Sequence, residues 1–270
     1  MAQDALHGPY AAAGSPQPLS EANFERHAEP DDRKVTVMRK HRAGALLAMA
    51  GLLLTGAAGQ LPTRTAAMAE QRATGVCDGV RRCHQVATVD VDGDGTADPV
   101  GIARRGKDGA EHGKVIVRVK VGDTIVSTRR KTSYWYGSPW QGAGRLDGEA
   151  GKDLMVGSTS GAHTLFFHGL TWRDGSLVTL DAPGRGHAWV IDGAYSIAIG
   201  WLRKGSWPAG KIYKRTAVRQ ESGKFKGTVT SFRWTKGAWE PTSGSSAYPM
   251  SDKQAYSWSG FHVPGLKRYE

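Results

Sequence analysis

The sequence predicts an all-β domain, and three features carry that prediction. Glycine is abundant, with 36 residues in a chain of 270. Short segments in which apolar and polar residues alternate recur along the chain, and a period of two is typical of half-buried β-strands. The apolar spacing of amphipathic helices is scarce. We therefore expect short antiparallel strands joined by tight turns.

The expected strands follow one another closely along the chain. The clearest alternating segments are residues 115–121, 124–127, 164–167, 177–180 and 228–234. Glycine and aspartate mark hairpin turns within residues 121–124, 172–176 and 236–239, because these residue types adopt the backbone angles that such turns require. Strands adjacent in sequence should thus pair with each other.

The N-terminal region has the pattern of a secretory signal and should not contribute to the fold. Residues 38–42 are basic, residues 43–58 form an apolar run, and Ala67-Met68-Ala69 offers small residues for cleavage before Glu70. The run is too short for a permanent membrane span. We expect residues 38–69 to be a signal peptide, residues 1–37 a disordered extension or a mis-assigned start, and residues 70–270 a single secreted, extracellular domain.

Export also decides how the two cysteines are interpreted. Cys77 and Cys83 are the only cysteines in the chain. An oxidising compartment favours a disulfide between them. Such a bridge would hold the mature N-terminus beside the first strand.

An acidic loop at residues 90–98 carries the clearest chemical signal. It reads Asp-Val-Asp-Gly-Asp-Gly-Thr-Ala-Asp. Ca²⁺ takes six to eight oxygen ligands, and a loop of this kind supplies them at alternate positions. The sequence predicts one Ca²⁺ site with side-chain ligands Asp90, Asp92, Asp94 and Asp98 and the carbonyl of Thr96. Without a cation these carboxylates would repel one another.

The loop is not an EF-hand. The twelfth position of an EF-hand loop is a bidentate glutamate, and here it is Gly101. Residues 84–89 before the loop and 99–102 after it suit strands better than helices, because they are β-branched or contain proline and glycine. The loop should join two strands.

These residues resemble the FG-GAP or VCBS-like repeat, whose calcium loop lies in a hairpin of a β-propeller blade. A weaker copy follows at residues 146–157, with Arg145 at the first ligand position, where an arginine could replace the ion. A third copy at residues 191–200 keeps only Asp192. The resemblance implies a propeller-like fold, one competent calcium loop and a role in binding more than in catalysis.

The number of blades is left open by the sequence. Only three blade-sized units are visible, whereas closed propellers usually have four or more. The alternatives are an incomplete propeller, a fourth unit assembled from residues 77–89 and 255–263, and another β-sheet arrangement that contains the same hairpin. We expect the assembled fourth unit.

Charge and aromatic residues suggest a class of partner. The chain has a net charge of +11, and basic clusters occur at residues 129–131, 203–204 and 211–219. A basic exterior attracts polyanions, which outside the cell would be wall polymers, acidic glycans or stray nucleic acid, and nucleic acid is the least expected of these. Tyr134, Trp135, Tyr136 and Trp140 lie in a turn-rich stretch and could stack on sugar faces, unless their rings cap the core instead.

The sequence gives little support to catalysis. Residues 157–161 read Gly-Ser-Thr-Ser-Gly, which has threonine where the G-x-S-x-G nucleophile elbow has serine. We therefore predict a non-catalytic, calcium-binding surface or adhesion module. The alternatives are a lectin-like glycan-binding protein and a secreted hydrolase on the same scaffold.

Overall fold

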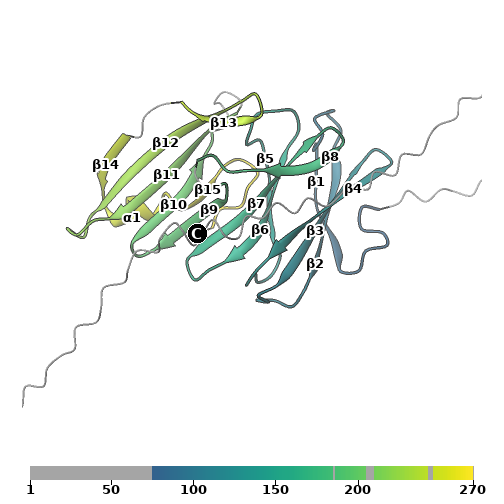
Figure 1. Cartoon of the computed structure of the whole chain (residues 1–270), viewed down its shortest axis with the longest axis horizontal. Helices are drawn as coiled ribbons and strands as arrows, with labels where there is room; N and C mark the ends of the chain where they lie inside the picture. The colour runs from purple at the N-terminus through teal and green to yellow at the C-terminus, as the bar shows by residue number, and fades with distance from the viewer. Residues whose placement is uncertain (1–74, 185, 205–209, 243–245, 270) are drawn as a thin grey trace, which may run out of the picture. The chain divides into compact units, whose positions relative to one another are not determined.

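Antiparallel strands dominate the computed structural model, which describes residues 75–184, 186–204, 210–242 and 246–269 (Figure 1). The only helix in these residues is α1 (Asp252–Tyr256). All of them belong to the unit Arg72–Glu270. The expected extension 1–37 and signal segment 38–69 lie outside the described residues. The all-β prediction is confirmed.

The first twelve strands form three consecutive groups of four, and within each group every strand pairs antiparallel with the next. The first group is a separate sheet of β1 (Cys83–Val89), β2 (Asp98–Arg105), β3 (Gly113–Val121) and β4 (Thr124–Thr132). The second contains β5 (Trp140–Gly144), β6 (Asp153–Ser160), β7 (Thr164–Arg173) and β8 (Ser176–Leu180). The third contains β9 (Trp189–Ala194), β10 (Ile197–Leu202), β11 (Lys211–Arg219) and β12 (Phe225–Thr235).

The second and third groups merge into one 11-stranded sheet, because β7 pairs with β9 as well as with its neighbours in sequence. Three further strands complete that sheet. They are β13 (Ala238–Pro241), β14 (Ser246–Met250) and β15 (Gly260–His262).

The expected fourth unit built from both ends of the domain is wrong. β1 pairs with β2 in the four-stranded sheet, whereas β15 pairs parallel with β10 in the other sheet. A hairpin closes only a short loop, so β1 finds its partner locally. β15 can approach β10 because Gly200 and Gly260 lie opposite each other and carry no side chains.

All three expected hairpin turns are confirmed. Val121 pairs with Thr124, Arg173 with Ser176, and Thr235 with Ala238, so each turn has two central residues. Asp174 and Gly175 have φ of +47° and +78°. Positive φ at both central positions is typical of the tight hairpin turns that match the twist of the strands.

Two apolar clusters hold the groups together. One contains side chains from the first and second groups, among them Val100, Val117, Leu154 and Leu170. The other joins the second and third groups and includes Phe167, Trp189 and Trp201 together with Phe261 of β15. Burial of this apolar surface is the main force that fixes the positions of the hairpin loops between the groups.

The predicted disulfide between Cys77 and Cys83 is present, with a Cα separation of 5.3 Å. Cys83 is the first residue of β1, and a side chain at Gly101 of β2 would meet both sulfur atoms at about 3 Å. The bridge therefore fastens the start of the described domain to the first hairpin. Among the described residues no helix has the length and apolar character needed to cross a membrane.

Candidate functional site: the acidic hairpin loop

The acidic loop connects β1 to β2, as its flanking sequence predicts. Val91 and Val100 are buried at 1% and 0% exposure and anchor the two sides of the loop in the core. Gly93 and Gly95 have φ of +84° and +86°. Glycine adopts these angles without steric cost, so the loop can fold back within a few residues.

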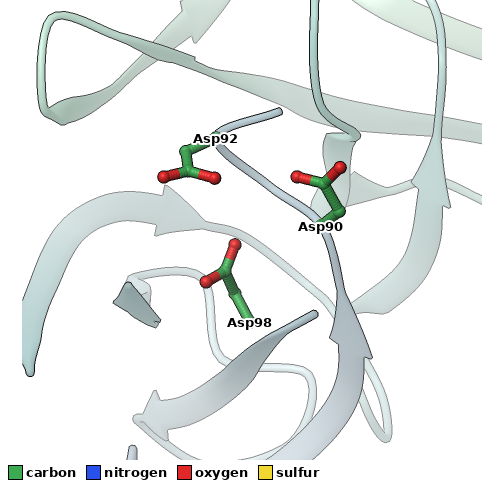
Figure 2. A group of neighbouring side chains, drawn as sticks. All are labelled: Asp90, Asp92 and Asp98. Atoms are coloured by element: carbon green, nitrogen blue, oxygen red, sulfur yellow. The ribbon is translucent and has the colours of Figure 1, made fainter. Parts of the chain in front are cut away.

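Three of the predicted ligands come together in this loop. Asp90, Asp92 and Asp98 each offer a carboxylate oxygen, and these oxygens lie within 4.8 Å of one another. Figure 2 shows Asp90 and Asp92 on the loop and Asp98 at the start of β2, with their carboxylates directed toward a shared space. Oxygens at about 2.4 Å from one Ca²⁺ lie at most about 4.8 Å apart, so this spacing fits a single ion.

Asp94 and Thr96 lie differently from the prediction. Asp94 is exposed and does not belong to the group of three. One of its carboxylate oxygens accepts a hydrogen bond from the Thr96 N–H at 2.6 Å. Ligation by Asp94 and by the Thr96 carbonyl stays a prediction.

Backbone N–H groups partly satisfy the acids of the loop. Asp90 accepts from the N–H groups of Gly93 at 2.7 Å and Gly95 at 3.2 Å, and Asp98 accepts from Val91 at 2.9 Å. Burial raises the pKa of Asp98 above its ordinary value, and the charges of Asp92 and Asp94 raise it further. A cation in the shared space would offset both effects.

The second hairpin loop, between β5 and β6, shares two hydrogen bonds with the acidic loop. Asp153 accepts a hydrogen bond from Leu146 N–H at 2.7 Å, seven residues earlier, just as Asp98 accepts from Val91. Asp147 accepts from Glu149 N–H at 2.9 Å, as Asp92 does from Asp94 N–H at 3.2 Å. Residues 146–153 thus share with residues 91–98 the two hydrogen bonds made by their first and last aspartates.

An arginine supplies positive charge in this second loop, but from an unexpected place. Arg173 of β7 forms an ion pair with Asp147, whose side chain is 2% exposed. Arg145, the residue at the first ligand position, is exposed. The sequence indicates an internal cation correctly but names the wrong residue, because Arg173 reaches the loop only through pairing of β6 with β7.

A second buried arginine lies near the same acids. Arg203 is 7% exposed, and burial and the charge of Arg145 lower its pKa while Asp153 acts in the opposite direction. Burial, followed by the charge of Asp147, raises the pKa of Asp153 to about 7. The second loop therefore has buried acids with the charges of two arginines nearby.

The third copy keeps only one local hydrogen bond, made by Asp192 near the end of β9. Asp192 accepts a hydrogen bond from Ala194 N–H at 2.7 Å and another from the Thr164 hydroxyl. The three aspartates at positions 92, 147 and 192 thus share one feature, a side chain that accepts from the N–H two residues later. This local hydrogen bond recurs once in each group of four strands.

The first two loops touch each other. Lys152 N–H donates to Asp90 C=O at 2.8 Å. A side chain at Gly93 would meet Ala150 at 2.4 Å, and one at Gly151 would meet the Val91 carbonyl oxygen at 2.2 Å. The acidic loop is therefore part of the contact between the four-stranded sheet and the 11-stranded sheet.

The expected aromatic stacking set divides into buried and exposed members. Trp135 and Trp140 are 4% and 9% exposed and belong to the apolar clusters. Gly157 makes room for the Trp135 ring, since a side chain there would meet it at 2.4 Å. These two tryptophans cannot present a face to a ligand. Tyr134 and Tyr136 are 48% and 71% exposed.

Comparisons with known protein families, with curated proteins and with solved structures find no match to this chain.

Proposed function

We propose that this domain is a secreted, non-catalytic binding module that one Ca²⁺ in the acidic loop stabilises, with an FG-GAP-like, propeller-type arrangement of its three strand groups. The observation that carries the proposal is the convergence of Asp90, Asp92 and Asp98 on a common space. Three acids held this closely and partly buried are costly without a cation.

The second loop supports this proposal by comparison. It shares two of the backbone hydrogen bonds, and Arg173 provides a positive charge beside Asp147. In the described part of the chain, the hydrogen bonds that Asp90, Asp92 and Asp98 accept come from backbone N–H groups, and no Lys or Arg side chain donates to them. A mobile cation in the first loop would do what the fixed guanidinium does in the second.

The position of the loop suggests what the ion would achieve. Because the acidic loop lies against the second loop, Ca²⁺ binding would stiffen the contact between the two sheets. The partner would be a polyanion such as a cell-wall polymer or acidic glycan, which the basic charge of the chain attracts. Of the predicted stacking residues, Tyr134 and Tyr136 remain available for a glycan.

Thermal unfolding with and without Ca²⁺ tests the proposal. A ligand at 100 times its Kd stabilises a fold by about 2.7 kcal/mol, so the wild type should melt at a higher temperature in Ca²⁺. Asp92→Asn should abolish this shift. Asp123→Asn removes the same charge from the exposed turn between β3 and β4 and should keep it. An equal shift in both variants would refute the assignment.

A further inference from the structure

A group of cationic side chains lies on one face of the 11-stranded sheet, away in sequence from the acidic loop. Arg215 of β11 is its centre. The Arg215 Nη2 donates to the Trp258 carbonyl oxygen at 3.2 Å, and its Cζ lies 5.6 Å from the centroid of the Trp258 ring. Its Nε is buried without a hydrogen-bond partner. A guanidinium has five N–H donors, so most of them are unused within the described residues.

The sheet is built to hold this guanidinium in place. Gly200 of β10 pairs with Arg215 on one side and with Gly260 of β15 on the other. A side chain at Gly200 would lie 1.8 Å from the Trp258 carbonyl oxygen. Glycine at this position lets the main chain at Trp258 lie directly against β10. The Trp258 carbonyl oxygen then holds the Arg215 side chain by a hydrogen bond.

His262 lies near Arg215 on the sheet, and the segment that carries Arg268 returns to the same row, because a side chain at Gly260 would lie 3.1 Å from the Tyr269 carbonyl oxygen. Arg215, Gly200 and Gly260 lie side by side on three neighbouring strands, and Tyr213, Leu202 and His262 do the same two residues further along. Residues two apart in a strand point to the same face, so His262 shares the face of Arg215. The His262 Nε2 lies 2.9 Å from the Ser259 carbonyl oxygen. Burial, Arg215 and Arg268 all lower the pKa of His262, and burial and Arg268 lower that of Arg215 to about 10.

No acidic side chain in the described part of the chain pairs with this group. Arg173 and Arg219 each have an aspartate partner, Asp147 and Asp252. The hydrogen bonds of Arg215 and His262 within the described ranges go to main-chain carbonyl groups instead. Arg215 is thus a partly buried cation without an acidic partner among the described residues, and such a charge destabilises a fold. An external anion would remove that cost.

We propose that Arg215, His262 and Arg268 form a binding site for a tetrahedral oxyanion, a sulfate or phosphate group. Arginine binds such groups with two parallel N–H bonds, which gives both affinity and orientation. The site deepens the proposed binding function by naming the chemistry of the partner, and it requires no Ca²⁺.

The ester group of a polymer and the free ion share this chemistry, and the aromatic residues bear on which polymer fits. The Trp258 ring has Arg215 over it, and it packs against Tyr248 in a T-shaped pair with ring centroids 5.8 Å apart and an interplanar angle of 88°. A ring already in contact on these sides is a poor platform for stacking a nucleobase. The geometry favours a sulfated or phosphorylated glycan over single-stranded nucleic acid.

Calorimetric titration at constant ionic strength tests the site, with sodium sulfate, sodium phosphate, heparin and single-stranded DNA as ligands. Arg268 is exposed, so Arg268→Gln should fold normally. We expect Arg268→Gln and Arg215→Gln each to weaken sulfate or heparin binding by about tenfold, the loss typical of one charged hydrogen bond. Arg129→Gln, an exposed residue of β4 with the same charge change, should bind as the wild type does.

Several results separate the possible outcomes. Equal affinity in Arg268→Gln, Arg129→Gln and the wild type, or no binding by the wild type, would overturn the site. Tight binding of the DNA through the same residues would keep the oxyanion site and overturn the choice of a glycan. Repeating the titrations in EDTA, and with Asp92→Asn, should leave the affinities unchanged, which distinguishes a failure here from a failure of the calcium proposal.

Discussion

The guanidinium of Arg173, on β7, forms an ion pair with the buried carboxylate of Asp147 in the loop between β5 and β6. Asp147 occupies the position that Asp92 has in the acidic loop, as the matching backbone hydrogen bonds show. The two loops therefore meet the same electrostatic requirement differently. One has an arginine of the chain, and the other collects three carboxylates around a shared space.

Removal of Arg173 should destabilise the fold strongly. In Arg173→Met the Asp147 carboxylate, 2% exposed, would lose its cation. Breaking a buried ion pair by removing one partner costs about 3 to 5 kcal/mol, because the other charge stays buried. Urea unfolding measures this difference.

The double variant Arg173→Met, Asp147→Asn is the control for this prediction. It removes both charges and should recover a large part of the lost stability. If the single and double variants unfold at the same urea concentration, the ion pair is not what stabilises the second loop.

Contact between the first two loops can be tested with two glycines of equal backbone geometry. Gly151 and Gly95 both have φ of +86°, so alanine adds the same backbone strain at each. A Cβ at Gly151 would lie 2.2 Å from the Val91 carbonyl oxygen, whereas a Cβ at Gly95 would have no neighbouring atom within 4 Å. Gly151→Ala should be less stable than Gly95→Ala by about 1 to 3 kcal/mol in chemical unfolding. Equal losses would show that the loops do not pack together.

The local features of the fold were predictable from the sequence. Alternating segments and glycine-containing turns predict the hairpins, because a hairpin is set by a two-residue turn and by the strands directly beside it in the sequence. The spacing of Asp90, Asp92 and Asp98 within nine residues likewise predicts their convergence. The disulfide between Cys77 and Cys83 was predictable for the same reason, because its two cysteines are only six residues apart in the sequence.

Pairings between distant residues were not predictable in this way. The partner of Asp147 lies 26 residues away on β7, and nothing in the spacing distinguishes it from Arg145. The position of β15 beside β10 depends on Gly200 and Gly260, which look like turn residues in the sequence. Trp135 and Trp140 look exposed in a turn-rich stretch, and only Gly157 and the apolar clusters reveal them as core.

Asp153 should give stability a specific dependence on pH. Its pKa is raised from the ordinary 3.8 to about 7, mainly by burial and then by Asp147. Between these values the folded state holds a proton that the unfolded state has released. The contribution of Asp153 to stability should therefore fall as pH rises from 4 to 7, with a limiting slope of about 1.4 kcal/mol per pH unit.

Comparison with Asp153→Asn isolates this contribution. The free energy of unfolding of the wild type minus that of Asp153→Asn should decrease across the window and level off above pH 7. Asp123→Asn, at an exposed position, serves as the control and should follow the wild type. A difference that is constant with pH, or that increases, would show that Arg203 keeps Asp153 ionised in the fold.

Equilibrium dialysis against Ca²⁺ measures directly whether the acidic loop binds a divalent cation. We expect one bound ion per chain in the wild type, and none in a variant with Asp92→Asn and Asp98→Asn. A wild-type protein that retains no Ca²⁺, or a double variant that retains as much as the wild type, would contradict this expectation.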